Sequence, residues 1–396
     1  MRVPRFEPFP ALRYAPGVDL DAAAAPPYDV LSSSDVAALR ARHERNIVEI
    51  DLPGPEDDPE RYHRAARTMR AWEDEGTLVR DEAPTFTLYR MRFTTEDGTE
   101  RETVGVLGAL EVVDEGAGGV LPHERTTPKA KTDRLDLTRA TEANLSPVWG
   151  LSLTAGLTEL LTEPAEVVGR CTDEQGVLHT VERVTDPERL SAIEAAVAAN
   201  PVLIADGHHR YAISRTYRDE RRTSGGRGPW DLTLTYVGEL VESQLSIDAI
   251  HRLYRGIGAD ALTAALERSF DLAPAGPIDP SFATRVVSEG ALCLVHADGT
   301  GTWLRPRASA FEGVRALDGA LLEHALADVE VDVSYQHGVQ HVVDLVRGGD
   351  VSAGVLIRPT SIDEIRRTAH EGLLMPPKST FFTPKLRTGL VMRPLV

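Results

Sequence analysis

Apolar and polar residues alternate along the chain with the two periods that distinguish strands from helices. Residues 85–93 and 101–113 alternate with a period of two on either side of an Asp97-Gly98 pair, which predicts a long β-hairpin. Residues 169–184 repeat the pattern around another turn and predict a second hairpin. The uninterrupted apolar run at 201–205 predicts a buried strand.

Helix signals accompany these strands. Ser32 to Asp35 has the Ser-x-x-acid form of a helix start, and Gly76 is placed to end the helix that follows Pro59. Further helices are expected at residues 186–200, 260–270, 316–326, 338–349 and 361–372. Further strands are expected at residues 231–240, 291–306 and 387–395, with a flexible loop at 221–230. This mixture predicts an α+β fold with mixed sheets.

Length and charge narrow the class of protein. A chain of 396 residues fits two domains or one elaborated domain, and 42% hydrophobic with 26% charged residues is ordinary globular composition. The net charge of −18 argues against non-specific binding to nucleic acid or to anionic membranes. A small basic pocket inside an acidic surface remains compatible with that charge.

The cysteines and the absence of targeting signals favour a soluble cytoplasmic protein. Cys171 and Cys293 are flanked by apolar residues and lack metal-ligand spacing, so both are expected to be reduced core residues. The chain starts without an apolar signal segment, and no run approaches the ~18 apolar residues of a membrane span.

Candidate chemistry is densest in Ala205–Ser214, where the predicted buried strand gives way to a helix. Asp206 and Gly207 form the turn, and the helix is expected to start near His208 and to run past Tyr217. The first turn of a helix presents free backbone N–H groups and the positive end of the helix dipole. Three adjacent side chains add donors at the same point: His208, His209 and Arg210. The stretch therefore predicts an anion site, suited above all to phosphate.

Simpler interpretations of this stretch remain open. The two histidines can cap the helix while Arg210 pairs with a surface acid, and Asp206 can be a plain turn residue. A metal ion shared by the histidines is disfavoured, because adjacent helical residues point about 100° apart. The spacing of a Walker A loop is absent.

Three other stretches place polar and basic residues in proline-fixed segments. Residues 121–134 are expected to be a loop that contains His123, Glu124, Arg125, Thr126, Lys129, Lys131 and Arg134. Residues 375–387 contain Lys378, Ser379, Thr380 and Lys385 between prolines, and residues 26–30 hold Tyr28 and Asp29. Such loops are often only solvated surface. Because proline lowers the entropy that a loop loses on binding, a polyanion site built from them is the sharper hypothesis.

These motifs together resemble one family from end to end. "PPYDV", "HERT", "ADGHHRYA", "IHRLY" and "MPPKSTFFTPKLRTGLV" are similar to the family catalogued as domain of unknown function 1015. The Asp-Gly-His-His-Arg box also resembles the phosphate-binding box of the ParB/sulfiredoxin superfamily and its free serine kinases. The chain departs from the family's usual motifs at Ala212, Ile213, Ser214 and Pro377.

The resemblance implies a fold and an activity. The implied fold is a ParB/sulfiredoxin-like nucleotide-binding core at residues 1–250, followed by a C-terminal α/β region at 251–396 that adds the MPPKST loop. The implied reaction transfers a phosphoryl group from ATP, with Mg²⁺, to the hydroxyl of free L-serine and yields O-phosphoserine. The donor nucleotide and the oligomeric state stay open.

Residue roles follow from the same resemblance. Binding of nucleotide phosphates is expected from Gly207, His208, His209, Arg210, His123, Thr126, Lys378, Ser379, Thr380 and Lys385. Asp206 is the favoured general base and metal ligand, and Glu124 is the second catalytic carboxylate unless it only pairs with a nearby arginine. Tyr28 and Asp29 are expected to contact the substrate. Two alternatives remain, a non-catalytic nucleotide switch of the ParB type and a phosphatase or kinase for another small metabolite.

Overall fold

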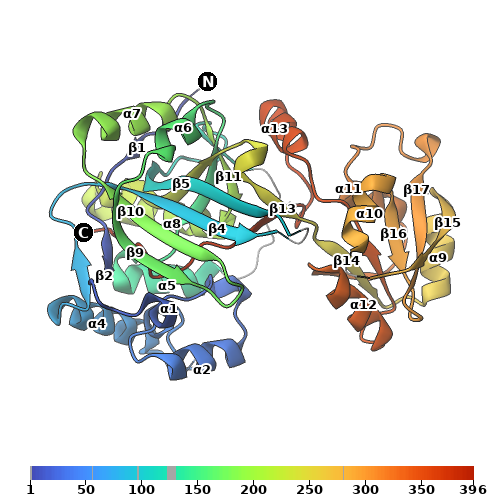
Figure 1. Ribbon diagram of the computed structural model, residues 1–396, viewed down its shortest axis with the longest axis horizontal. Helices are drawn as coiled ribbons and strands as arrows, with labels where there is room; N and C mark the ends of the chain where they lie inside the picture. The colour runs from blue at the N-terminus through green and yellow to red at the C-terminus, as the bar shows by residue number, and fades with distance from the viewer. Residues whose placement is uncertain (1, 56, 96–97, 123–130, 280) are drawn as a thin grey trace. The chain divides into compact units, whose positions relative to one another are not determined.

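The structure is a computed structural model that describes residues 2–55, 57–95, 98–122, 131–279 and 281–396 (Figure 1). The chain folds into two compact units. The first comprises Met1–Leu245, Ala369–Gly372 and Pro384–Val396, and the second comprises Ser246–Thr368 and Leu373–Thr383. The boundary expected at residue 250 does not anticipate that the end of the chain returns to the first unit.

A mixed sheet organises the first unit. Its strands in the described residues are β1 (Phe6–Glu7), β4 (Phe86–Thr94), β5 (Glu100–Glu111), β6 (Val120–Pro122), β8 (Val148–Ser152), β9 (Glu166–Thr172), β10 (Leu178–Val184), β11 (Val202–Asp206) and β12 (Leu232–Glu239). They follow the order β6-β11-β8-β12-β5-β4-β10-β9, and β1 also pairs with β5. The antiparallel pairs β4–β5 and β9–β10 confirm the two predicted hairpins, although Asp97 lies outside the described residues. β12 is parallel to β8 and antiparallel to β5, which confirms an α+β fold with a mixed sheet.

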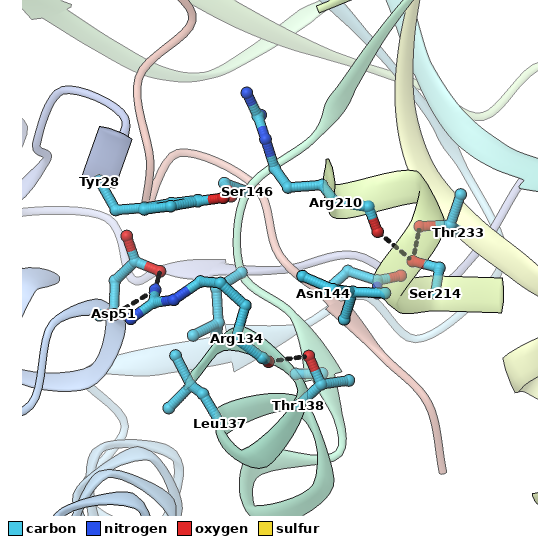
Figure 2. Close-up of a pocket in the computed structure, with 13 residues that line it drawn as sticks. Tyr28, Asp51, Arg134, Leu137, Thr138, Asn144, Ser146, Arg210, Ser214 and Thr233 are labelled. Carbon is cyan, nitrogen blue, oxygen red and sulfur yellow. Dashed lines mark hydrogen bonds and ion pairs between the residues drawn. The ribbon is translucent and has the colours of Figure 1, made fainter. Parts of the chain in front are cut away.

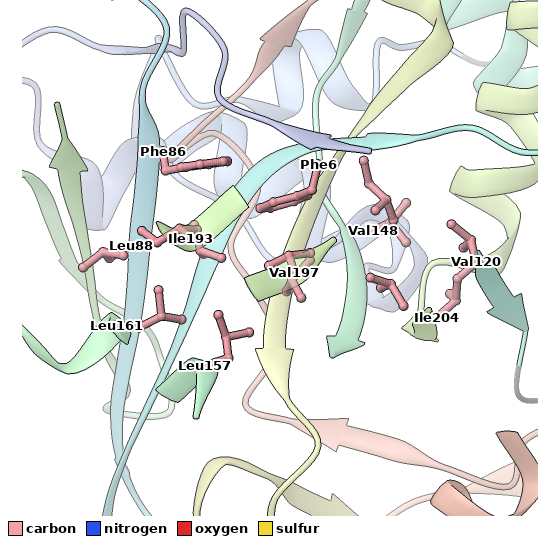
Figure 3. Close-up of a cluster of buried hydrophobic side chains, with 14 of the residues drawn as sticks. Phe6, Phe86, Leu88, Val120, Val148, Leu157, Leu161, Ile193, Val197 and Ile204 are labelled. Carbon is pink, nitrogen blue, oxygen red and sulfur yellow. The ribbon is translucent and has the colours of Figure 1, made fainter. Parts of the chain in front are cut away.

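Apolar side chains fill the space between this sheet and two helices, α6 (Leu157–Thr162) and α7 (Pro187–Val197) (Figure 3). Phe6 and Phe86 stack in the sheet with ring centroids 5.1 Å apart. The helices contribute four side chains with no exposed surface: Leu157, Leu161, Ile193 and Val197. This burial of apolar surface supplies the main favourable free energy that holds α6 and α7 against the sheet.

Short helices of the first unit surround a separate core. They are α1 (Leu20–Ala23), α2 (Ser33–Arg42), α3 (Val48–Asp51), α4 (Arg61–Asp74) and α5 (Lys131–Thr141). Two small strand pairs accompany them, β2 (Leu12–Tyr14) with β3 (Leu78–Arg80) and β7 (Ala143–Asn144) with β21 (Arg393–Pro394). Both helix signals in this region are confirmed, since Ser32 and Asp35 form a capping box and Gly76 follows α4 with a φ of 75°.

Three expectations about irregular and extended segments are wrong. Helix α5 starts inside the expected loop 121–134, and it is held by packing of Leu135 and Leu137, which are buried although the surrounding sequence is polar. Helix α8 (His208–Gly225) continues into the expected loop 221–230. The expected strand at 387–395 is reduced to the two residues of β21, and its other pairings are isolated bridges of Thr388 with Ala25 and of Met392 with Leu12.

The second unit contains an antiparallel sheet in the order β15-β17-β16-β19-β14-β18. The strands are β14 (His251–Arg255), β15 (Phe270–Pro277), β16 (Leu292–Val295), β17 (Thr300–Pro306), β18 (Asp332–Gln336) and β19 (Ala353–Leu356), and β13 (Ser246–Asp248) pairs with β20 (Phe381–Thr383). The helices are α9 (Ala259–Glu267), α10 (Phe282–Glu289), α11 (Asp318–Ala325) and α12 (Val339–Arg347). Helix α13 (Ile362–Glu371) has residues in both units. Among the described helices, none is long and apolar enough to span a membrane.

Both cysteines are buried free thiols, as predicted. Cys171 lies in β9 and Cys293 in β16. Burial raises the pKa of each thiol to about 12, so both stay protonated at neutral pH. They act as small core residues rather than as nucleophiles.

The ring of Tyr236 packs against Gly105 in β5 and leaves no room for a side chain there. A Cβ at Gly105 would lie 2.3 Å from Tyr236 Cζ, whereas a Cβ at Gly238 in β12 would meet the same ring at an ordinary 3.6 Å. We expect Gly105→Ala to destabilise the protein by about 1–3 kcal/mol, because a fully buried tyrosine must move. Gly238→Ala should change the free energy of unfolding by less than ~1 kcal/mol. Equal effects of the two variants in urea denaturation would contradict this account.

His251 in β14 makes the stability of the fold depend on pH. Its side chain is buried, Nδ1 accepts a hydrogen bond of 3.2 Å from the N–H of Ile357, and burial lowers its pKa to about 3. The unfolded chain binds the proton near pH 6.5 and the folded chain does not, so this residue's stabilisation is lost as the pH falls from about 6.5 towards 3. Between pH 7 and pH 5 we expect a loss of about 2 kcal/mol from this group. Urea denaturation of His251→Gln should lack that part of the loss, and an unchanged pH dependence would refute the assignment.

Candidate functional site

The candidate site is built at the junction of β11 and α8, where the sequence predicts a strand-to-helix turn. Gly207 is the N-cap of α8, with a left-handed φ of 84°, and it has no side chain to occupy the free N–H groups of the first turn. A Cβ at Gly207 would approach Arg210 Nε to 3.1 Å and Val148 Cα to 3.3 Å. Both the conformation and the close approach therefore favour glycine here. The helix begins at His208, which confirms the predicted start.

Side-chain hydrogen bonds attach α8 firmly to the sheet. The hydroxyl of Tyr211 donates to the carbonyl of Glu111 at 2.9 Å and accepts from the N–H of Val113 at 2.8 Å. Ser214 Oγ lies 2.8 Å from Thr233 Oγ1 of β12. These contacts come from the first two turns, so the N-terminus of α8 is fixed relative to the strands that end beside it.

Arg210 is held in one orientation from two sides. Its guanidinium donates to Asp206 Oδ2 at 2.8 Å and to the carbonyl of Pro147, and only 11% of its side chain is exposed. Burial lowers the pKa of Arg210, but the attraction of Asp206 and Asp29 outweighs it, so the net shift is upward. Arg210 is therefore a fixed positive charge at the start of α8.

The carboxylate of Asp206 lies between two cations. Lys385, from the C-terminal stretch that returns to the first unit, places Nζ 3.7 Å from Asp206 Oδ1, while Arg210 occupies Oδ2. The structure thus brings Lys385 to the Asp-Gly-His-His-Arg box across a large separation in sequence. Both cations stabilise the ionised form of this carboxylate.

A small pocket lies beside Arg210 (Figure 2). Polar and charged groups line most of it: Tyr28, Asp51, Arg134, Thr138, Asn144, Ser146, Arg210, Ser214 and Thr233. The pocket unites the 26–30 stretch, the end of the 121–134 stretch and the start of α8. The space open to the centre of a water molecule is about 50 Å³, which suits a few waters or one small polar group rather than a whole nucleotide.

Asp51 and Arg134 form a buried ion pair in this pocket, and the sequence did not single out Asp51. Arg134 Nη1 lies 3.1 Å from Asp51 Oδ1 and 2.5 Å from its backbone carbonyl, and the guanidinium also stacks 4.5 Å from the ring centre of Tyr28. Burial lowers the pKa of Arg134, but the charges of Asp51 and Asp133 outweigh it, so the net shift of this pKa is upward. Burial raises the pKa of Asp51, and the charge of Arg134 opposes that shift. The sequence did contain a signal for Asp51, because a carboxylate inside the apolar run 47–52 is expected to be buried and to need a partner.

The other predicted site residues divide into three groups. His208 and His209 lie half-buried in the first turn of α8, and Asp29 lies exposed on a short 3₁₀ helix, Tyr28–Val30. His123, Glu124 and Thr126 lie outside the described residues. The remaining group belongs to the second unit, whose placement against the first is not described: Lys378, Ser379 and Thr380.

Lys378 and Ser379 of the second unit are held by hydrogen bonds within that unit. Lys378 adopts a positive φ of 58°, and its carbonyl accepts a hydrogen bond of 3.1 Å from Arg252. Ser379 is buried and donates to the carbonyl of Pro376 at 2.7 Å. Its backbone carbonyl in turn accepts from the Thr360 hydroxyl at 2.8 Å. The motif is therefore a tightly bonded turn within its unit.

The described residues do not fit a Mg²⁺ ion held by the protein alone. They contain no group of three or more His, Cys, Asp or Glu side chains that could hold a metal. Asp206, the predicted ligand, already pairs with Arg210 and Lys385. Mg²⁺ commonly binds through substrate phosphates and waters with few carboxylates, and only that mode is compatible with this surface.

The fold and site define a class: an α+β protein with a cationic helix N-terminus beside a buried ion-pair cluster. The chain belongs to the family described as protein of unknown function (DUF1015), whose family model matches residues 6–320. Comparison with curated proteins finds no match.

Solved structures similar to this chain share little sequence with it. A free serine kinase variant in complex with AMP is 11% identical, with a TM-score of 0.37 over 68% of this chain and 89% of that one. SbnI with a C-terminal truncation, from Staphylococcus aureus, is 15% identical, with a TM-score of 0.39 over 73% and 87%. A conserved hypothetical protein from Pyrococcus furiosus is 12% identical, with a TM-score of 0.36 over 68% and 92%. Likeness at this level does not extend to substrate or mechanism.

The buried pair in the pocket predicts a large effect of removing one charge. We expect Asp51→Asn to lower the free energy of unfolding by about 3 kcal/mol, because Arg134 then keeps only the half-exposed Asp133 as a counter-charge. Asp136→Asn on α5, the helix of Arg134, is the matched control, since the pair of Asp136 with Arg139 is exposed and is worth less than ~1 kcal/mol. Urea denaturation measures both variants, and equal losses would contradict a special role for the buried pair.

Proposed function

We propose that this protein is a nucleotide-dependent small-molecule kinase that phosphorylates the hydroxyl of free L-serine. The observation that carries the proposal is the start of α8, where an uncapped helix N-terminus, two histidines and the fixed guanidinium of Arg210 converge. Helix N-termini with adjacent cations favour phosphate groups. The resemblance of the Asp-Gly-His-His-Arg box to that of free serine kinases supplies the acceptor.

Phosphoryl transfer mainly requires positioning and neutralisation of charge. In the proposed site the backbone N–H groups that follow Gly207 bind phosphate oxygens, and His208 and His209 donate further hydrogen bonds. Arg210 contributes a charge whose orientation is already set by Asp206 and Pro147. Because these donors are fixed before the nucleotide arrives, little of the binding free energy is lost in ordering them.

Asp206 is better suited to positioning than to accepting a proton. Both of its oxygens face cations, Arg210 at 2.8 Å and Lys385 at 3.7 Å, and protonation would remove both attractions. We therefore assign it the placement of those two side chains. The exposed carboxylate of Asp29, whose charge acts on Arg210, becomes the proposed general base among the described residues. Glu124 is the other carboxylate expected near the acceptor.

The second unit is proposed to complete the site. Its turn at Lys378, Ser379 and Thr380 carries one cation and two hydroxyls next to each other. A nucleotide bound at α8 would be covered if this turn closed over the transferring phosphoryl group. Tyr28 is proposed to contact the acceptor, since it lines the small pocket beside Arg210. Mg²⁺, carried by the nucleotide phosphates, would neutralise their charge.

The activity is tested directly with the pure protein. It is incubated with ATP, Mg²⁺ and a panel of hydroxyl-bearing amino acids and metabolites, and phosphorylated products are resolved by mass. O-phosphoserine as the dominant product supports the proposal. If another metabolite is phosphorylated instead, the protein is still a kinase, but its acceptor is that metabolite and not serine. Nucleotide binding without any product would identify a switch, and absence of nucleotide binding would overturn the proposal.

The role of Asp206 can be separated from that of a base. We expect Asp206→Asn to weaken nucleotide binding about tenfold, because Arg210 and Lys385 lose their shared anchor. The acidic limb of its pH–rate profile should remain, since the base is elsewhere. Asp29→Asn should bind nucleotide normally and lose at least ~10²-fold in turnover. Calorimetry and turnover on the same preparations provide the measurement, and loss of the acidic limb in Asp206→Asn alone would make Asp206 the base.

A further inference from the structure

A second and larger pocket lies in the first unit, at the opposite end of α8 from the candidate site. Helix α8 ends at Gly225, and Arg227 on the following turn lines the pocket. The helix has 18 residues, so its length of about 27 Å separates the two locations. The space open to the centre of a water molecule is about 480 Å³, which is within the range of pockets that bind small molecules.

Four arginines line this pocket: Arg5, Arg80, Arg227 and Arg393. Two of them lack strong counter-charges in the described part of the chain. Arg227 is exposed and forms no ion pair there, and Arg80 has only Glu73, with 3.9 Å between Arg80 Nη2 and Glu73 Oε2. The pocket therefore carries positive charge that the fold itself leaves largely uncompensated, in a protein whose net charge is −18.

Arg393 is the most unusual of the four. Its residue is 4% exposed, and its guanidinium donates to the carbonyls of Leu232 at 3.0 Å and Pro229 at 2.9 Å, while Nε has no hydrogen-bond partner among the described residues. Burial lowers its pKa to about 10, so it remains charged at neutral pH. No carboxylate of the described residues forms an ion pair with it. Its guanidinium carbon also lies 5.8 Å from the ring centre of Phe9, and the charge of Glu7 acts on it without forming an ion pair. A buried charge without a directly paired carboxylate is unfavourable unless a counter-ion can approach.

The two acidic side chains that line the pocket already have partners within the fold. Glu7 pairs with Arg5 at 3.0 Å, and Asp231 pairs with Arg222 at 2.6 Å and accepts from the N–H of Gly228. The charge of Glu7 also acts on Arg393, but neither Glu7 nor Asp231 forms an ion pair with Arg80, Arg227 or Arg393.

We propose that this pocket binds a small organic anion that carries two or more carboxylate or phosphate groups. Guanidinium groups bind both kinds of oxyanion through paired hydrogen bonds, and several arginines around one space favour a multivalent ligand. Apolar side chains between them would contact the carbon skeleton: Phe9, Pro10, Leu232 and Pro394. The volume exceeds what one inorganic phosphate needs, which favours an organic anion.

The test is calorimetric titration of the full chain with citrate and, separately, with inorganic phosphate at low ionic strength. We expect saturable binding of citrate at one site, and weaker binding of phosphate, with an affinity that falls as NaCl is added. Arg227→Gln should weaken citrate binding about tenfold or more, because an exposed cation without a structural partner is lost. Arg70→Gln is the matched control. It removes an exposed arginine from α4, outside the pocket, and should change the affinity less than twofold.

Two further variants locate the bound anion. Arg80→Gln should weaken citrate binding as Arg227→Gln does, whereas Lys385→Met at the candidate site should leave it unchanged. Preferential binding of phosphate over citrate would correct the ligand class to phosphorylated molecules. Absence of saturable binding by both anions would overturn the proposal, as would equal affinities of wild type, Arg227→Gln and Arg80→Gln. Neither result bears on the proposed kinase activity, which is assayed at the other end of α8.

Discussion

The ion pair between Asp206 and Arg210 is the contact on which the candidate site depends. It joins the last residue of β11 to the first turn of α8, across a glycine with a left-handed φ of 84°, where a Cβ would lie 3.1 Å from Arg210 Nε. The strand is fixed by its neighbours in the sheet, and the helix by the hydroxyls of Tyr211 and Ser214. The guanidinium is therefore held in one orientation at the start of α8, with 11% of the side chain exposed. A phosphate site needs such a fixed donor more than it needs a flexible cation.

Buried charge recurs in the first unit, and its partners explain why the fold tolerates it. Arg13 pairs with Asp81, Arg134 with Asp51, and Arg218 with Asp114 and Asp219. Each guanidinium has a carboxylate within ion-pair distance, which offsets the free energy lost on removal from water. Arg393 departs from this pattern, because its hydrogen bonds go to carbonyl groups and no carboxylate of the described residues forms an ion pair with it. That contrast is the reason its pocket is assigned a ligand while the other three arginines are given structural roles.

Family membership and geometry contribute different parts of the functional argument. The family is one of unknown function, so membership by itself names no reaction. The geometry of α8 supports the proposal that an anion with several oxygens binds there, but it does not name the acceptor. Serine is proposed as the acceptor only because the short Asp-Gly-His-His-Arg box resembles that of free serine kinases. The donor site and the acceptor are therefore supported by separate observations, and each can be revised without the other.

The sequence by itself determined the features that depend on neighbours a few residues apart. The period-two runs of β4 and β5, the capping box of Ser32 and the glycine turn before His208 are all local, and all appear in the structure. The helical start of α5 is different, since its sequence is polar and only packing of Leu135 and Leu137 favours it. Tertiary structure alone decided that Asp51 faces Arg134, that Lys385 reaches Asp206 and that Arg393 is buried without a carboxylate. Each of these contacts joins segments far apart in the chain, and its free energy is gained only after the loop between them has closed. No local pattern therefore encodes such a contact.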